Sequence, residues 1–189
     1  MLGAITGDII GSRFEANNHR SRKFELFLGD KSFFTDDTAL TIAVARWLLG
    51  DDELSNLFVE TVKRYPRLSY GGMFHMWAIR GGGAPYNSFG NGSAMRVSPV
   101  AAFARDEQEC LLLAKQSAAV THNHPEGIKG AQATAWATYK ASHGVDIGEI
   151  RSGLKKRFGY DMSKTVAEWA NDYLFKGYFS ERDSYGYEN

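Results

Sequence analysis

Apolar residues recur along most of the chain with the 3.6-residue spacing of amphipathic helices. This spacing predicts helices over 36–49, 54–65, 107–120, 125–143 and 147–158. Glycine or proline stands beside most of their ends, where it terminates or starts a helix. The long Val/Ile/Thr alternation of strands is missing, so we predict an all-α fold.

The helix over 36–49 is apolar almost all round, which predicts a central position in the core. The first residues, MLGAITGDIIG, predict another helix, with glycines at positions 3, 7 and 11 on one stripe. Glycine in a helix costs about 1 kcal/mol relative to alanine. The stripe therefore predicts that another backbone or a ligand approaches closely there.

A segment rich in glycine and aromatic residues, 67–97, lies between the predicted helices over 54–65 and 107–120. We predict a long loop with a short helix around 73–79, followed by Ser98 as the N-cap of a further helix. Loops of this length inside a compact domain usually carry function.

The composition is that of a globular protein: 189 residues, 43% hydrophobic and 23% charged, with no formal net charge. This balance gives no support to a nucleic-acid partner or a polybasic membrane patch. Cys110 is the single cysteine, which excludes an intrachain disulfide or a cysteine zinc site and favours a reducing, cytoplasmic location. The N-terminus lacks the basic region of a signal peptide.

Two adjacent acids, Asp36 and Asp37, stand between threonines where the central helix begins. Capping explains one acceptor at a helix N-terminus and tolerates a second negative charge near the helix dipole. Carboxylate and hydroxyl oxygens are also the ligands that Mg²⁺, Mn²⁺ and Ca²⁺ prefer. Both interpretations, a helix cap and a metal site, remain open from the residues alone.

Three further clusters are candidates for chemistry. The stretch GNGSAMR, 90–96, suits backbone contacts to a phosphate or sugar, but Asn-Gly is also a common turn. The stretch THNHPEG, 121–127, offers two histidines as ligands or proton carriers, or as local packing and a helix cap. Asp8 and Glu15 flank the end of the first helix, and either could be structural.

Taken in order, GAITGDIIGSRFE, FFTDDTALT, YGGMFHMW, GNGSAMRVSPV and THNHPEGIKGAQATA resemble the ADP-ribosylglycohydrolase family. The resemblance runs from residue 1 to about 172, and we expect residues 173–189 to form a divergent tail. It implies an all-helical bundle with two magnesium or manganese ions in a cleft. It also implies hydrolysis of the bond between ADP-ribose and a modified protein side chain or small conjugate.

The resemblance also implies roles for individual residues. Thr35, Asp36 and Asp37 resemble the first metal-binding motif, and Glu15 resembles the glutamate that orients or activates water. As catalytic residues we therefore predict Glu15, Asp36 and Asp37. The predicted ligand contacts are Tyr70, Gly71, Gly72, Asn91, Gly92, Ser93, His122 and His124.

This sequence departs from the family pattern near its C-terminus. The family has an Asp-x-Asp-Thr or Asp-x-Asp-Ser motif that completes the metal site, and no Asp-x-Asp occurs here. The nearest substitute is the stretch 181–184, Glu-Arg-Asp-Ser. We therefore expect weaker coordination, with one ion or none, in a shortened bundle. A homodimer that covers exposed apolar surface and a truncated gene product are two expectations that follow.

The principal hypothesis is thus a metal-dependent glycohydrolase that acts on ADP-ribosylated protein or an ADP-ribose conjugate, with activity reduced by the absent ligands. The alternative is a catalytically inactive remnant that binds ADP-ribose or a protein partner. A different metal-dependent phosphohydrolase would explain the carboxylates but not the ordered motifs.

Overall fold

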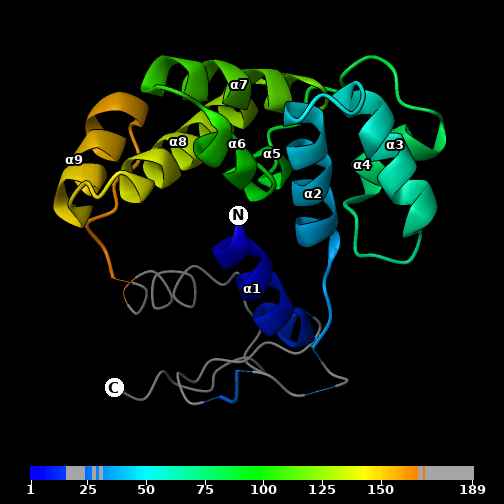
Figure 1. Ribbon diagram of the computed structural model, residues 1–189, viewed down its shortest axis with the longest axis horizontal. Coiled ribbons are helices and arrows are strands. Elements are labelled where there is room, and N and C mark those ends of the chain that lie inside the picture. Colours follow the sequence, from blue (N-terminus) through cyan, green and yellow to red (C-terminus); the bar gives the residue numbers. More distant parts are fainter. Residues whose placement is uncertain (16–23, 27–28, 30–31, 166–167, 169–189) are drawn as a thin grey trace.

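The computed structural model describes residues 1–15, 24–26, 29, 32–165 and 168, and regular structure in this part of the chain is entirely helical (Figure 1). The prediction of an all-α fold is confirmed. The helices are α1 (Leu2–Gly11), the 3₁₀ turn η1 (Ser12–Phe14), α2 (Asp36–Leu48), α3 (Leu54–Arg64), α4 (Gly72–Ile79), α5 (Gly92–Met95), α6 (Ser98–Phe103), α7 (Glu107–Ala119), α8 (Pro125–Ser142) and α9 (Ile147–Phe158).

The helix α2 lies in the middle of the molecule, between α1, α3, α5 and α6 (Figure 1). Its buried apolar side chains, Leu40, Ala43 and Val44, belong to the main hydrophobic core. The predicted central position is therefore correct. One face is open, however, because Ile42 is 44% exposed.

The helix α8 organises the other half of the fold and packs against α5, α6, α7 and α9. Its alanines at 131 and 135 are fully buried, and such small side chains allow a neighbouring helix to approach closely. At its far end, Trp136 packs against Phe158 of α9 in a second, smaller core. The two halves meet at α5 and α6, which contact both α2 and α8.

Three predicted helix ends are confirmed, and one predicted helix start is not. Gly50, Gly144 and Gly159 take positive φ angles of 86°, 74° and 76° just past α2, α8 and α9, where an L side chain would be strained. The predicted N-cap at Ser98 is wrong. Ser98 is already helical, Val97 occupies the cap position, and the Ser98 hydroxyl has no hydrogen-bond partner among the described residues.

The segment 67–97 contains two short helices, α4 and α5, where one was predicted. The helix α4 covers the predicted 73–79 and adds Gly72. Phe74 and Trp77 are buried in the main core, so they anchor α4 to it. The residues between α4 and α5 are not helical and run toward the start of α8.

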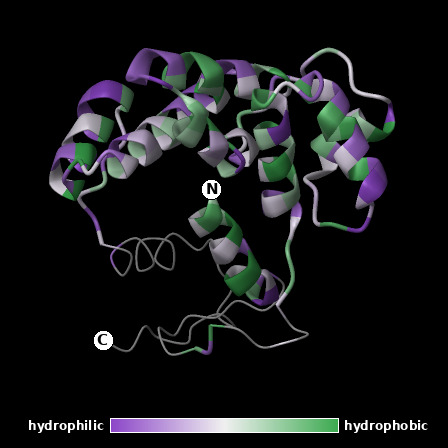
Figure 2. Ribbon diagram, in the orientation of Figure 1, coloured by the Kyte–Doolittle hydropathy of each residue, from purple (hydrophilic) through white to green (hydrophobic). Residues whose placement is uncertain are grey.

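The glycine stripe of α1 is not in close contact with another described backbone. A Cβ built at Gly3, Gly7 or Gly11 would meet no described atom within 4 Å. No residue of α1 is buried, although Figure 2 shows that much of this helix is hydrophobic. No described backbone therefore approaches the stripe, and the approach of a ligand stays a prediction.

Within the described residues, no helix combines the length and the apolar character that crossing a lipid bilayer would require.

Candidate active site

The N-terminus of α2 is capped by two side chains that leave both aspartates available. The Thr35 hydroxyl accepts a hydrogen bond from the backbone N–H of Asp37 at 3.3 Å. Asp8 of α1 accepts from the backbone N–H groups of Thr35 and Thr38 at 2.8 and 3.2 Å, and from their hydroxyls at 2.6 and 2.5 Å. Because Asp8 and Thr35 satisfy these groups, capping does not account for the carboxylates of Asp36 and Asp37.

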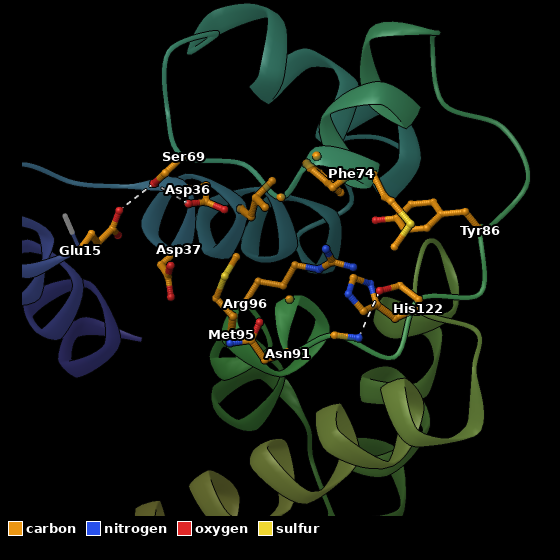
Figure 3. A pocket seen from close by; sticks show the side chains of 17 residues that line it. Glu15, Asp36, Asp37, Ser69, Phe74, Tyr86, Asn91, Met95, Arg96 and His122 are labelled. Carbon is orange, nitrogen blue, oxygen red and sulfur yellow. Dashed lines mark hydrogen bonds between the residues drawn. The ribbon is translucent and has the colours of Figure 1, made fainter. Parts of the chain in front are cut away.

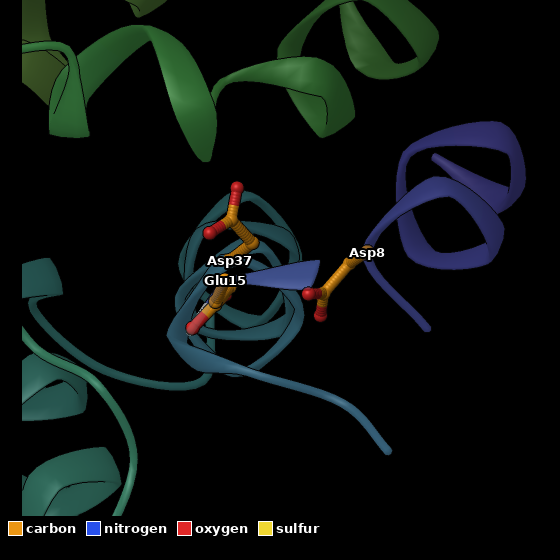
Figure 4. Close-up of side chains that lie close together, drawn as sticks. All are labelled: Asp8, Glu15 and Asp37. Carbon is orange, nitrogen blue, oxygen red and sulfur yellow. The ribbon is translucent and has the colours of Figure 1, made fainter. Parts of the chain in front are cut away.

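Asp37 gathers with two other acids beside this cap. One carboxylate oxygen each from Asp8, Glu15 and Asp37 lies within 4.8 Å of the other two (Figure 4). Asp8 comes from α1 and Glu15 from just beyond η1, so three separate stretches of chain contribute. A single cation could contact oxygens at this spacing.

Asp36 points in a different direction, as expected for neighbours about 100° apart on a helix. Its Oδ1 accepts from the Ser69 hydroxyl at 3.3 Å, and the same hydroxyl lies 2.9 Å from Glu15 Oε2 (Figure 3). Ser69 therefore links Asp36 to the three-acid cluster. The four acids form one continuous acidic region, with Asp36 buried and Glu15 exposed.

The acidic region carries uncompensated negative charge. Burial and then the charge of Asp37 raise the pKa of Asp36 to about 6, and burial and then Asp8 raise the pKa of Asp37. None of the ion pairs between described residues includes any of the four acids. An all-oxygen donor set with excess negative charge fits a hard divalent cation such as Mg²⁺ or Mn²⁺.

Three of the four acids, Glu15, Asp36 and Asp37, form one end of a cavity of about 510 Å³ between α2, α4 and α5 (Figure 3). Phe74, Tyr86 and Met95 provide apolar and aromatic wall. Glycines at 71, 72, 90 and 92 also line it, which exposes backbone to any bound molecule. The volume lies within the range of roughly 300–1,000 Å³ that small-molecule sites occupy.

The opposite end of the cavity is formed by Arg96 and His122 (Figure 3). Arg96 is almost fully buried, with its guanidinium 4.2 Å from the centroid of the Phe58 ring. Burial lowers the pKa of Arg96 to about 10, so it is a cation at neutral pH. The cavity therefore has a negative end and a positive end, a polarity suited to a ligand that carries both an anionic group and hydroxyls.

The model of the family described as ADP-ribosylglycohydrolase matches residues 1–182, nearly the whole chain. The chain belongs to the ADP-ribosylglycohydrolase family. It is 29% identical over 174 residues to the ADP-ribosylhydrolase ARH3 of Xenopus tropicalis, a match that covers 76% of this chain and 49% of that protein. Matches to ARH3 of Mus musculus and Homo sapiens are 27% and 26% identical over 183 residues and cover 79% of this chain and 50% of each relative. The chain thus spans about half the length of the curated relatives that it matches.

Most residues predicted for the ADP-ribosylglycohydrolase site line this one cavity. They are Glu15, Asp36, Asp37, Gly71, Gly72, Asn91, Gly92 and His122. Thr35 lies beneath the acidic region, where its hydroxyl is engaged by Asp8. Segments as far apart as Glu15 and His122 are brought together because α2 packs against both α1 and α5.

Three predicted ligand contacts lie outside the cavity lining. Tyr70 packs on the main core, stacks on His75 and donates to the Thr61 carbonyl at 3.4 Å. Ser93 is buried and donates to the Gly127 carbonyl at 2.8 Å, which joins α5 to α8. His124 caps α8 by accepting from the Glu126 N–H at 3.1 Å. All three hold the cavity walls in position.

The structure adds residues that were not predicted for the site: Ser69, Phe74, Tyr86, Ser88, Met95 and Arg96. Ser69 is the first residue of the stretch SYGG, 69–72, and Arg96 is the last residue of the quoted stretch GNGSAMR. Both therefore belong to motifs recognised in the sequence, but neither was assigned a role there. Asp8 was recognised as a candidate but not assigned to the metal. Its proximity to Asp37 depends on how α1 docks onto α2, which the local sequence does not reveal.

Proposed function

We propose that this chain is a metal-dependent hydrolase that cleaves the glycosidic bond between ADP-ribose and a protein side chain or small conjugate. The observation that carries the proposal is the acidic region at one end of a cavity whose other end is cationic and lined by glycine. Membership of the ADP-ribosylglycohydrolase family supports the same chemistry.

Asp8, Glu15 and Asp37 would hold the divalent cation, Mg²⁺ or Mn²⁺, and Asp36 would hold a second ion or orient the first through its own oxygens. Asp8 accepts four hydrogen bonds that fix the position of its oxygens, so it would be a preorganised ligand. When bound, the ion supplies positive charge that orients ribose hydroxyl oxygens and offsets the repulsion between the acids.

Glu15 is the residue we assign to the attacking water. It is exposed at the rim of the acidic region, and the Ser69 hydroxyl fixes one of its oxygens at 2.9 Å. In hydrolysis, the bond from the anomeric carbon to the acceptor breaks while a bond from that carbon to the water oxygen forms. Glu15 accepts the water proton, and a proton from solvent or from Glu15 completes the released acceptor. The neighbouring carboxylates stabilise positive charge that develops on the sugar.

The remaining cavity wall would bind the rest of ADP-ribose. Backbone at 71–72 and 90–92 lies against the cavity without side chains in the way, apart from Asn91. Arg96 supplies positive charge at this end, which suits the diphosphate. The length of the cavity then separates the diphosphate from the bond that is cleaved.

The test is release of ADP-ribose from ADP-ribosylated arginine and ADP-ribosylated serine peptides by purified protein with Mg²⁺ or Mn²⁺. We expect release that a chelator abolishes and added metal restores. A double variant, Asp36→Ala with Asp37→Ala, should show none. Binding of ADP-ribose that ignores chelator and is never followed by turnover would instead favour the inactive remnant and overturn the proposal.

A further inference from the structure

The cationic end of the cavity contains a hydrogen-bonded chain of three buried residues. Arg96 Nη2 lies 2.8 Å from Thr121 Oγ1, and Thr121 Oγ1 lies 2.8 Å from His122 Nδ1. Arg96 also donates to the Ser117 carbonyl at 3.4 Å. All three members of the chain are buried, but only Arg96 and His122 line the cavity.

The chemistry of these groups determines which atom donates and which accepts in each hydrogen bond. A guanidinium only donates hydrogen bonds, so Thr121 Oγ1 is the acceptor from Arg96. A hydroxyl oxygen that accepts from a cation is polarised, which makes its own O–H a stronger donor and its oxygen a poorer acceptor. The Thr121 hydroxyl also forms a hydrogen bond with Tyr86, whose own O–H can donate to the second lone pair of Oγ1. The favourable arrangement therefore has Thr121 accepting from Arg96 and Tyr86 and donating its single hydrogen to Nδ1 of His122.

A neutral imidazole that accepts at Nδ1 carries its hydrogen on Nε2. The Nε2 edge of His122 faces the glycines of the cavity wall: a Cβ built at Gly92 would lie 3.2 Å from Nε2, and one built at Gly90 would lie 3.9 Å away. The absence of side chains at 90 and 92 leaves this edge of the ring next to the space that a ligand would occupy.

The surroundings of His122 also keep its ring neutral. Burial and then the positive charge of Arg96 lower the pKa of His122 to about 4. The other titratable side chain in contact with the ring is Tyr86, at a centroid distance of 6.1 Å, and burial raises its pKa, so it is uncharged. Among the described residues, no carboxylate pairs with His122 to favour the imidazolium.

We infer that Arg96, acting through Thr121, is a positioning residue that fixes His122 as an Nε2–H hydrogen-bond donor at the cavity wall. His122 in this state neither shuttles protons nor binds a metal ion through Nε2. It recognises an acceptor oxygen of an anionic ligand. That last step rests on the proposed function, in which the ligand is ADP-ribose, whereas the tautomer is a property of the protein alone.

The tautomer is measured directly by NMR on the ligand-free protein labelled with ¹⁵N-histidine, with His122→Asn used to assign the signal. We expect Nδ1 of His122 to show the shift of an unprotonated ring nitrogen and Nε2 that of a protonated one. Neither shift should change between about pH 5.5 and 8, the range in which an ordinary histidine titrates.

Two substitutions at Thr121 separate positioning from packing. Thr121→Val keeps the shape but removes the hydroxyl, and we expect His122 to become a mixture of tautomers. The Kd for ADP-ribose should rise about three- to tenfold, the effect of one net hydrogen bond. Thr121→Ser keeps the hydroxyl and should retain the single tautomer.

Arg96→Met tests the start of the chain, because it keeps an apolar stem against Phe58 but removes the charge. We expect His122 to begin titrating at higher pH. If this variant does not fold, Thr121→Val decides the matter. A hydrogen on Nδ1 in the wild-type protein, or an unchanged tautomer in Thr121→Val, would overturn the inference. The predicted tautomer in a protein that neither binds nor hydrolyses ADP-ribose would refute only the proposed function.

Discussion

The two ends of the cavity carry opposite charges and differ in how those charges are compensated. At the acidic end, Asp8, Glu15 and Asp37 place like charges within 4.8 Å of one another, with no cationic side chain of the described residues paired to them. At the other end, Arg96 is buried against the Phe58 ring and donates to Thr121. The first arrangement would gain stability from a divalent cation, as the proposed function requires. In the second, Arg96 Nη2 donates to groups of the protein itself, whereas Arg96 Nε has no hydrogen-bond partner among the described residues.

This difference indicates how the two ends contribute to function. Burial and then repulsion from a neighbouring carboxylate raise the pKa values of Asp36 and Asp37, which is a cost to the ion-free fold and would favour binding of a divalent ion. The buried hydrogen-bond chain instead fixes donors in advance, so a ligand need not order them on binding. Variants at the acidic end should therefore change metal dependence and turnover, and variants at the other end should change ligand affinity.

The largest effect is expected from Asp37→Asn, which removes one charged member of the acidic cluster. We expect ADP-ribose release to fall at least about 100-fold, because metal-site substitutions combine weaker ion binding with slower chemistry. Release is measured over a Mn²⁺ titration. Asp106→Asn is the matched control, since Asp106 caps α7 and asparagine also caps well. Equal activity in both variants would contradict a catalytic role for Asp37.

Asp36→Asn should stabilise the ion-free protein, in a manner that depends on pH. The pKa of Asp36 is raised from 3.8 to about 6, so the folded state holds this proton more tightly than the unfolded chain does. The resulting penalty is absent below about pH 3, grows between about pH 4 and pH 6, and is nearly complete above about pH 7. We expect the free energy of unfolding of Asp36→Asn to exceed that of wild type by at most about 3 kcal/mol at about pH 8.

Urea unfolding in chelator at several pH values checks this prediction. The difference between the two proteins should disappear below about pH 3, where Asp36 is protonated in both states. Adding Mg²⁺ at about pH 8 should reverse it, since an ion that binds the folded state stabilises the wild type more. A difference that is the same at every pH would show that the charge of Asp36 is not its cause.

Gly127→Ala tests whether the wall beside His122 depends on close packing. A Cβ at Gly127 would lie 2.6 Å from the Ser88 carbonyl oxygen and 3.0 Å from His122 Cβ, so we expect a loss of about 1–3 kcal/mol in the free energy of unfolding. The control is Gly130→Ala on the same helix, whose Cβ would meet only Tyr160 Oη, at 3.9 Å. That variant should gain up to about 1 kcal/mol from helix propensity. Thermal unfolding of both proteins distinguishes packing from propensity.

The smallest effect is expected from Ser69→Ala, which removes the hydroxyl between Glu15 and Asp36. The hydrogen bond from Ser69 lowers the pKa of Asp36, so its loss raises that pKa further and weakens metal binding at neutral pH. We expect the Kd for Mn²⁺ to rise about three- to tenfold in a calorimetric titration. Ser142→Ala, at the exposed end of α8, should leave it unchanged.

Several elements followed from local sequence alone. The helices over 54–65, 125–143 and 147–158 were predicted to within one residue of α3, α8 and α9 at each end. Their apolar spacing, prolines and glycines act over a single turn of chain, so each signal is complete in the sequence. Ser98 was misplaced because a serine before proline suits either the cap or the first helical turn, and packing against α2 and α8 decides which.

The candidate site was predictable in part. The aspartate pair stood out because a cap needs one acceptor, and the family resemblance added Glu15 and the glycine loops. That Asp36 and Asp37 diverge, one to Ser69 and the other to Asp8, depends on the position of α1 and of residue 69. Tyr70 looked like a ligand contact in SYGG, but burial turned its ring into the core.

The sequence by itself determined the helical character of the chain, the positions where its helices end, and the residue types that can hold a cation. Only the tertiary structure decided which of those residues share a cavity, because hydrophobic packing of α2 and α8 brings together segments more than a hundred residues apart. It also decided the direction of the hydrogen bonds that link Arg96 through Thr121 to His122. A hydrogen bond has a direction only when its donor and its acceptor lie in fixed places.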